Sequence, residues 1–296
     1  MRVAVNGRAM EAHQAATVHD LLRRMTAAGL DVSLTPTLAS WFREGNWPVL
    51  QDRDPAAQGI DLCIGLGGDG TLLDTVGWVG RSDVPVLGIN LGRLGFLANV
   101  RLEEVDQALA ALGQRRYTLQ ERSMVEVIGQ EAALGPANFA LNEVSVHKRD
   151  TSSMIAVHVH LGTTYLNTYW ADGLIIATPT GSTAYSLSCG GPVLHPTSDA
   201  LVITPISAHN LNVRPFVVPD RFTVELQVEA RADKCLLNLD TRSVSIDGDS
   251  RLSIRKAPFT LKMVELEGQD FLTTLREKLN WGLDLRSGLS GRGKGA

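Results

Sequence analysis

The sequence lacks the features that mark several large classes of protein. Its three cysteines, Cys63, Cys189 and Cys235, lie far apart and match neither a zinc-binding spacing nor a disulfide framework. No apolar run approaches the roughly 20 residues that a membrane-spanning helix needs. The net charge of −4 gives no overall basic field that would attract nucleic acid or a membrane surface. The N-terminal run Met1–Val5 reads as a strand without a signal peptide, so we expect a cytoplasmic protein with no nucleic-acid or membrane partner.

The composition is that of a globular protein able to bury a core. The chain has 296 residues, of which 44% are hydrophobic and 20% charged, and this length predicts two domains or one large one. Its first part alternates strand and helix patterns, which favours an α/β domain with a parallel sheet. The strands are expected at 2–6, 31–34, 60–66 and 84–90, and the helices at 17–29, 38–43 and 71–79. In such a sheet, ligands collect at the carboxyl ends of the strands, where Asp69 and Asn90 fall.

The pattern of the sequence changes from alternating strands and helices to mostly strands after the helix expected at 103–115. From there to about residue 267 the chain consists mostly of short strands and turns, which indicates an all-β sandwich. Strands are expected at 124–128, 138–147, 155–161, 174–178, 201–204, 223–228, 243–246 and 261–265. A last helix at 270–281 is expected to pack back on the first domain. We therefore predict an α/β domain at 1–100 completed by 268–285, a β-sandwich domain at 101–267, and a disordered tail at 286–296.

The glycine-rich stretch 64–71, Ile-Gly-Leu-Gly-Gly-Asp-Gly-Thr, is the centre of the first domain. It reads as the end of a buried strand, a turn and the start of a helix. Glycines at 67, 68 and 70 let backbone N–H groups approach an anion closely, and the positive end of the helix favours phosphate. The spacing is neither that of a P-loop nor Gly-x-Gly-x-x-Gly. Asp69 in this loop suits a proton acceptor or a ligand of a divalent cation, while a plain strand-to-helix turn remains the alternative.

Two further stretches have the character of binding sites. Residues 172–192 carry an apolar strand that opens into a run rich in hydroxyls, glycine and proline, which suits a purine edge, a ribose or a phosphate. The alternative is a Ser/Thr-rich loop that caps a helix from Thr183. Asn142 and Glu143 are adjacent polar residues in a strand pattern. They read equally as a hydrogen-bonded edge pair or as a contact to a diol or a base.

Together these residues resemble the NAD kinase family, whose members phosphorylate the 2′-hydroxyl of the adenosine ribose of NAD to give NADP. Gly-Gly-Asp-Gly alone is shared with diacylglycerol and sphingosine kinases and with phosphofructokinases, but the motifs in this order are specific. The resemblance rests on residues 67–71, 88–97, 142–143 and 172–185, and the C-terminal residues 271–276 and 281–282 are similar to those of bacterial members. It covers most of the chain.

The resemblance implies a Rossmann-like domain followed by a β-sandwich, and a role for each matching residue. Asp69 would be the general base near the 2′-hydroxyl, and Gly67, Gly68, Gly70 and Thr71 would bind the phosphates of ATP. Asp69 and Gly70 would also contact NAD. Glu143 would hold the ribose hydroxyls of NAD, and Asn142 would contact its adenosine. The adenine would be framed by Thr183, Ala184 and Tyr185, and the same wall of the pocket would continue with Ser186, Leu187 and Ser188. Asp172 would lie near the nicotinamide end.

The resemblance also implies the substrates and the assembly. The substrates would be ATP and NAD, with Mg²⁺ or another divalent cation and no dedicated protein metal site, and the protein would be a homodimer or homotetramer. Two positions depart from the commoner pattern, Trp170 near Asp172 and Asp249, and no role is transferred to Asp249. The alternatives are a lipid or sugar kinase of the same superfamily and a non-catalytic NAD(P)-binding sensor, which would have little use for Asp69.

Overall fold

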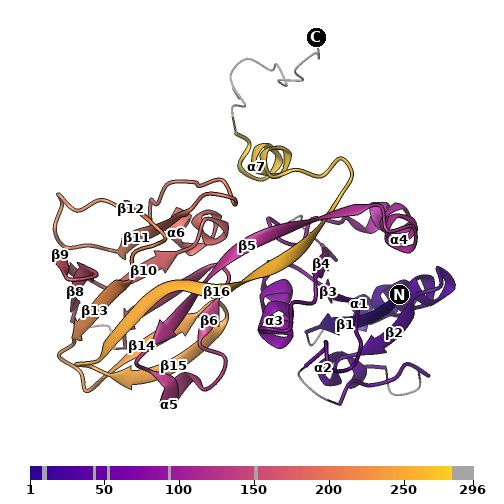
Figure 1. Cartoon of the computed structure of the whole chain (residues 1–296), viewed down its shortest axis with the longest axis horizontal. Coiled ribbons are helices and arrows are strands. Elements are labelled where there is room, and N and C mark those ends of the chain that lie inside the picture. Colours follow the sequence, from indigo (N-terminus) through magenta and orange to yellow (C-terminus); the bar gives the residue numbers. More distant parts are fainter. Residues whose placement is uncertain (9–11, 43–44, 52–53, 93–94, 150–152, 282–296) are drawn as a thin grey trace, which may run out of the picture. The chain divides into compact units, whose positions relative to one another are not determined.

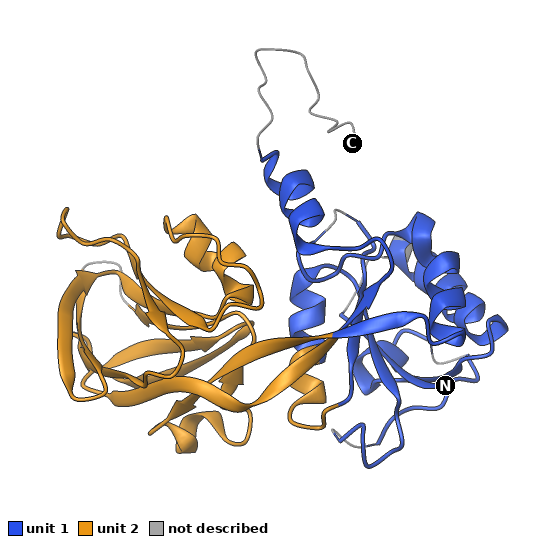
Figure 2. Cartoon of the chain, turned by 45° about the horizontal axis from the view of Figure 1, so that its top comes forward, with its two compact units in different colours: residues 1–75, 84–119, 264–296 blue, residues 76–83, 120–263 orange. Residues whose placement is uncertain are grey.

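The structure, a computed structural model, describes residues 1–8, 12–42, 45–51, 54–92, 95–149 and 153–281. The chain divides into two units (Figure 2), one of residues 1–75, 84–119 and 264–296, the other of residues 76–83 and 120–263. The first unit continues to Leu119, beyond the predicted boundary at 100, because Val105, Leu109 and Leu112 pack into its core. The predicted domain limits stay predictions, and the tail predicted at 286–296 lies outside the described residues.

Unit 1 is built on a parallel sheet with strand order β2-β1-β3-β4 (Figure 1). Its strands are β1 (Arg2–Gly7), β2 (Asp31–Leu34), β3 (Leu62–Leu66) and β4 (Val86–Ile89). Its helices are α1 (Ala12–Ala27), α2 (Pro36–Ala39), the first part of α3 (Asp69–Val79), η1 (Leu102–Glu104), α4 (Val105–Gly113) and α7 (Phe271–Leu279). The Rossmann-like domain and the return of the C-terminal helix to it are thus confirmed.

The local sequence explains where these helices lie. In α1, Val18, Leu21, Leu22 and Met25 are buried at helical spacing against the sheet. The helix predicted at 38–43 instead spans Pro36–Ala39, because proline takes a first-turn position where its missing N–H costs nothing. Among the described residues, no helix is both long and apolar enough to cross a membrane.

Unit 2 holds two layers of antiparallel strands, as the predicted sandwich requires (Figure 1). One layer contains β16 (Arg251–Leu266), β13 (Val224–Glu229), β8 (Ile155–Leu161) and β9 (Thr164–Ala171), with β5 (Tyr117–Ile128) and β6 (Phe139–Ala140) joined through β16. The other has the order β12 (Phe216–Pro219), β11 (Ala200–Ile206), β10 (Gly173–Ala177), β7 (Glu143–Lys148), β14 (Lys234–Leu239) and β15 (Arg242–Asp247). The short helices are α5 (Glu131–Leu134), η2 (Thr180–Thr183) and α6 (Tyr185–Ser188).

The core of unit 2 lies between these two layers. Val157 and Val224 from the first layer pack with Val146, Leu174 and Ile203 from the second. The sequence pattern missed β9, β12 and β14. β9, for example, is an edge strand whose side chains are mostly exposed or half-buried, so it lacks the alternation of apolar and polar residues that marks a half-buried strand.

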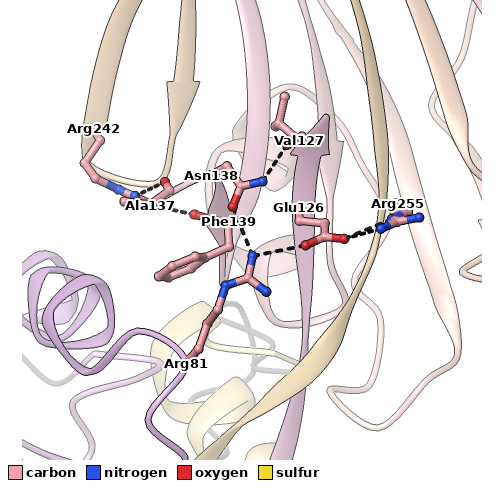
Figure 3. A network of polar contacts seen from close by, with 8 residues as sticks. All are labelled: Arg81, Glu126, Val127, Ala137, Asn138, Phe139, Arg242 and Arg255. Carbon is pink, nitrogen blue, oxygen red and sulfur yellow. Dashed lines mark hydrogen bonds and ion pairs between the residues drawn. The ribbon is translucent and has the colours of Figure 1, made fainter. Parts of the chain in front are cut away.

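A buried carboxylate ties the residues after α3 to the first layer of unit 2 (Figure 3). Glu126 on β5 is 6% exposed and accepts from Arg81 at 3.2 Å and from Arg255 at 2.8 Å. Arg81 also donates to Asn138 at 3.0 Å, and its guanidinium lies 4.5 Å from the centre of the Phe259 ring. Because both oxygens of the Glu126 carboxylate are paired with a cation, these contacts offset the free-energy cost of removing the carboxylate from water.

We predict that Glu126→Gln lowers the free energy of unfolding of unit 2 by on the order of 1–3 kcal/mol, because one charged acceptor serves two cations. Urea denaturation followed by circular dichroism measures the change. Asp247→Asn is the matched control, since its carboxylate pairs with Lys234 at an exposed position of the same unit and should leave the midpoint unchanged. Equal shifts for the two variants would contradict the role of the Glu126 pair.

Candidate functional site

The predicted glycine loop lies between β3 and α3 in unit 1. Gly67 has φ +150°, and a Cβ there would lie 2.3 Å from the Thr71 hydroxyl oxygen, so the fold itself requires glycine at this position. At Gly68 an added Cβ would meet nothing within 4 Å. The chain's own packing therefore gives no reason for glycine at 68, whereas a close approach of phosphate to the backbone does. The helix begins at Asp69, two residues before its predicted start at Thr71.

Asp69 is held by the segment that follows β4. Its carboxylate accepts the backbone N–H groups of Phe96, Leu97 and Ala98 at 2.8, 3.0 and 2.9 Å. A Cβ on Gly95 would lie 1.8 Å from Asp69 Oδ1, so this close approach also depends on glycine. A carboxylate offers about four acceptor positions, and the described residues fill three of them. With respect to these residues, about one position remains for a substrate hydroxyl or a cation.

Arg8 lies beside the glycine loop, and it was not identified from the sequence. It follows β1, its guanidinium pairs with Asp74, and a Cβ on Gly70 would lie 2.9 Å from its Nη1. The hydrogen bond to Asp74 raises the pKa of Arg8. A cation therefore stands beside the glycine loop. The available signal was its position directly after a parallel strand, at the same edge of the sheet as Asp69.

In unit 2, Asn142 and Glu143 stand at the start of β7. Val144 and Val146 face the core, so Glu143, Ser145 and His147 share the opposite face of the sheet. Across the β7–β10 ladder, Glu143 pairs with Ala177 and Ser145 with Ile175, whose side chains lie on that outer face with residues 189 and 194. The segment that follows β10 thus covers the surface on which Glu143 lies.

Two buried oxygens of this pair have no hydrogen-bond partner among the residues that the structure describes. They are Oδ1 of Asn142 and Oε2 of Glu143. The pKa of the Glu143 carboxyl is raised to about 8, mainly by burial and also by the charge of Asp240, while a hydrogen bond from the Tyr185 N–H opposes this shift. Because buried polar atoms are almost always hydrogen-bonded, open acceptors on two consecutive residues indicate a ligand that supplies donors. The diol or base contact is therefore favoured over the edge pair.

Several of the hydroxyls predicted to contact a ligand instead hold the segment 178–188 in place. Three are bonded inside the unit: Thr178 to the Leu141 carbonyl at 2.5 Å, Ser182 to the Leu194 N–H at 2.9 Å, and Ser186 to the Thr204 hydroxyl at 2.8 Å. Ser186 is fully buried. The density of Ser and Thr in this stretch therefore reflects in part how the chain is fixed onto the sheet.

The remaining predicted residues lie on or near the surface of this segment. The Tyr185 ring is stacked on the His147 ring at 5.7 Å with an angle of 4° between their planes. Thr183, Ala184 and Leu187 are half-buried and Ser188 is exposed. Asp172, between β9 and β10, pairs with Lys148 at 2.6 Å. Burial lowers the pKa of His147, and the nearby Asp172 charge opposes that shift.

The predicted residues thus form two groups, one in each unit. Gly67, Gly68, Asp69, Gly70 and Thr71 are together in unit 1, and the Asn142–Glu143 pair with the 172–188 stretch is in unit 2. Over the described part of the chain, no three His, Cys, Asp or Glu side chains gather in a way that could hold a metal ion. A cavity of about 780 Å³ lined by β9 and residues 209–216 contains none of the predicted residues.

Comparison with known proteins gives these groups a family. Residues 39–117 match the ATP-NAD kinase N-terminal domain and residues 141–266 match the ATP-NAD kinase C-terminal domain. An NAD kinase of Christiangramia forsetii is 39% identical over 97% of this chain and 100% of its own length.

Solved structures agree. A yeast NADH kinase complexed with NADH matches the fold with a TM-score of 0.81, at 22% identity, over 97% of this chain and 89% of that one. An NAD kinase from Archaeoglobus fulgidus in complex with ATP matches with a TM-score of 0.73, at 25% identity, over 95% of this chain and 99% of that one. Both family domains are present in the expected order, and a relative matches over its whole length: this chain belongs to the NAD kinase family.

Proposed function

We propose that this chain transfers the γ-phosphoryl group of ATP to the 2′-hydroxyl of the adenosine ribose of NAD, giving NADP. The observation that carries the proposal is the pair of open buried acceptors, Asn142 Oδ1 and Glu143 Oε2, in a member of the NAD kinase family. A nucleoside supplies hydroxyl and amino donors of the kind that these oxygens lack. Glu143 would hold the ribose hydroxyls and Asn142 the adenosine.

The loop of unit 1 would hold the phosphates of ATP. Gly67, Gly68, Gly70 and Thr71 would bind these phosphates. The space beside Gly68 is open, Thr71 lies in the first turn of α3, and the N-terminus of this helix favours negative charge. Arg8 would add a positive charge beside Gly70. Mg²⁺ commonly binds through one or two carboxylates together with substrate phosphates and water, so this site needs no protein cage for the cation.

Asp69 would act as the general base. Three of its acceptor positions are filled by N–H groups, so the hydroxyl to be phosphorylated would occupy the remaining one. Those three bonds fix the direction of that remaining lone pair. Phosphoryl transfer depends mainly on position and on charge neutralisation, so a base with a fixed orientation is a useful contribution.

The stretch after β10 would hold the rest of NAD. Thr183, Ala184 and Tyr185 would frame the adenine, and Leu187 and Ser188 would extend that wall. Ser186 would contribute through its backbone, because its hydroxyl is bonded to Thr204. Asp172, fixed by Lys148, would lie toward the nicotinamide. We also propose a cytoplasmic location and a homodimer or homotetramer.

One assay separates the three candidate functions. Purified protein is incubated with ATP, Mg²⁺ and NAD, and NADP is measured. Formation of NADP supports the proposal. Binding of NAD without NADP would favour the sensor, and phosphorylation of a lipid or sugar in place of NAD would favour the related kinases.

Asp69→Asn should reduce turnover by about 10²–10⁴-fold, the usual contribution of a general base, while NAD still binds. The structure adds an expected cost, because the amide nitrogen would face an N–H donor and loosen residues 96–98. Asp106→Asn, the same change at an exposed position on α4, is the control and should keep full turnover. Turnover of Asp69→Asn near that of wild type would remove Asp69 from the mechanism.

Gly68→Ala should raise the KM for ATP by about tenfold, because a methyl group would occupy the space into which a phosphate must approach. Its thermal stability should match wild type, since the added Cβ meets no protein atom within 4 Å. Gly113→Ala has equally open surroundings at the end of α4 and should leave the KM unchanged. An unchanged KM for ATP in Gly68→Ala would exclude the loop from phosphate binding.

NAD binding should strengthen as the pH rises from about 6 to 9, because Glu143 must be ionised to accept two ribose hydroxyls. Its pKa of about 8 means that the carboxyl is protonated below this pH, so affinity should fall about tenfold per pH unit there. Calorimetry in buffers of different ionisation enthalpy measures the proton released on binding. Glu143→Gln should bind weakly without this pH dependence, whereas His147→Asn should keep it. A pH-independent wild type would refute the assignment.

A further inference from the structure

We propose that Asp240 is a positioning residue for NAD binding, because it holds the backbone of the Asn142–Glu143 pair. This inference rests on the proposed function of that pair. Asp240 lies outside every motif considered in the sequence, about 100 residues after the pair that it contacts. It accepts three consecutive backbone N–H groups, from Leu141 at 2.8 Å, Asn142 at 2.8 Å and Glu143 at 3.2 Å.

These bonds are matched by a fourth in the opposite sense. The N–H of Asp240 donates to the Glu143 carbonyl at 3.1 Å. One residue therefore binds both the N–H and the C=O of Glu143. The backbone of a strand's first residue is usually less well fixed than the rest of the strand, because the residues on one side of it belong to a loop. Here the N–H and the C=O of Glu143, the first residue of β7, are both hydrogen-bonded to Asp240. The point from which the Glu143 side chain extends is therefore fixed.

The turn that carries Asp240 is suited to this role. Asp240 and Thr241 form the two-residue connection between β14 and β15, and Asp240 has φ +52°. Asp, Asn and Gly adopt this left-handed conformation most readily. The next residue, Arg242, donates to the carbonyls of Ala137 and Phe139 (Figure 3). The hairpin of β14 and β15 is thus hydrogen-bonded to both ends of the segment 137–143.

The opposite side of the pair is fixed as well. The Thr178 N–H donates to the Asn142 carbonyl at 2.8 Å, and a Cβ on Gly181 would lie 2.0 Å from that oxygen. Asn142 is therefore clamped between the Asp240 carboxylate and the start of the 178–188 stretch. The backbone that carries its Oδ1 is therefore held on both its N–H and its C=O before any ligand arrives.

Asp240 also acts on Glu143 through its charge. The groups that face Glu143 are the Asp240 carboxylate, the Cys189 thiol and the Tyr185 hydroxyl, with the Tyr185 N–H as a hydrogen-bond donor. Among them Asp240 is the charged neighbour that raises the pKa of Glu143, after burial. Burial raises the pKa of Asp240 itself, while the N–H groups of residues 141–143 and the charge of Arg242 favour its ionised form. Removing the Asp240 charge should therefore let Glu143 ionise at lower pH.

The experiment compares Asp240→Asn and Asp240→Gly with wild type. Both variants suit the left-handed turn, and both remove the charge, but Asn keeps one carbonyl acceptor. For Asp240→Asn we expect a KM for NAD about tenfold higher, an unchanged KM for ATP, and a pH midpoint of NAD binding shifted below that of wild type. Asp240→Gly should raise the KM further. Asp247→Asn, on β15 of the same hairpin, should behave as wild type.

Amide hydrogen exchange at residues 141–143 gives a second readout that does not depend on activity. It should be faster in both Asp240 variants and unchanged in Asp247→Asn. An unchanged KM for NAD, or a raised KM with an unmoved pH midpoint, would overturn the proposal. If wild type formed no NADP, the proposed function would fail instead. In that case the exchange rates and direct NAD binding across pH would still decide the role of Asp240.

Discussion

A single interaction recurs at the two places on which the site depends: one aspartate carboxylate that accepts three consecutive backbone N–H groups. Asp69 holds residues 96–98 in this way in unit 1, and Asp240 holds residues 141–143 in unit 2. Loops that carry function lack the ladder of hydrogen bonds that fixes strands and helices. A carboxylate supplies the missing acceptors at one point, and charge-assisted bonds are stronger than neutral ones.

The two carboxylates nevertheless serve different ends. Asp69 stands at the start of a helix, and it is itself proposed to contact substrate. Asp240 accepts from three backbone N–H groups, and its proposed effect on substrate passes through Glu143. The difference follows from the neighbours. Asp69 has about one acceptor position left for a hydroxyl, whereas Asp240 lies next to a second carboxyl whose ionisation it opposes.

The sequence predicted the α/β and β-sandwich architecture and pointed to the two groups of candidate residues. It did not predict the hydrogen bonds that hold those residues in place. Parallel strands, the glycine loop and the sandwich follow from periodicity and from turn residues, which act over a few positions. Asp240 could not be found in that way, because its partners are about 100 positions away along the chain, whereas Arg8 had a signal in its position directly after a parallel strand. The hydroxyl-rich stretch shows a second limit of the sequence. Ser182 and Ser186 have hydroxyls that are bonded inside the fold, and the sequence alone does not distinguish such hydroxyls from ligand contacts.

The span between Asp240 and its partners also bears on how the chain folds. Leu141 and Asp240 are separated by 99 positions, so the start of β7 gains its anchor only after β14 and β15 have been synthesised and paired. Contacts between residues so distant in sequence form late, since the chain entropy of closing a long loop must first be overcome. A nascent chain that has emerged only as far as β13 still lacks β14, β15 and β16, so the backbone proposed to recognise NAD is without its anchor. Competence to bind would then arrive near the end of folding, when little of the protein remains to be made.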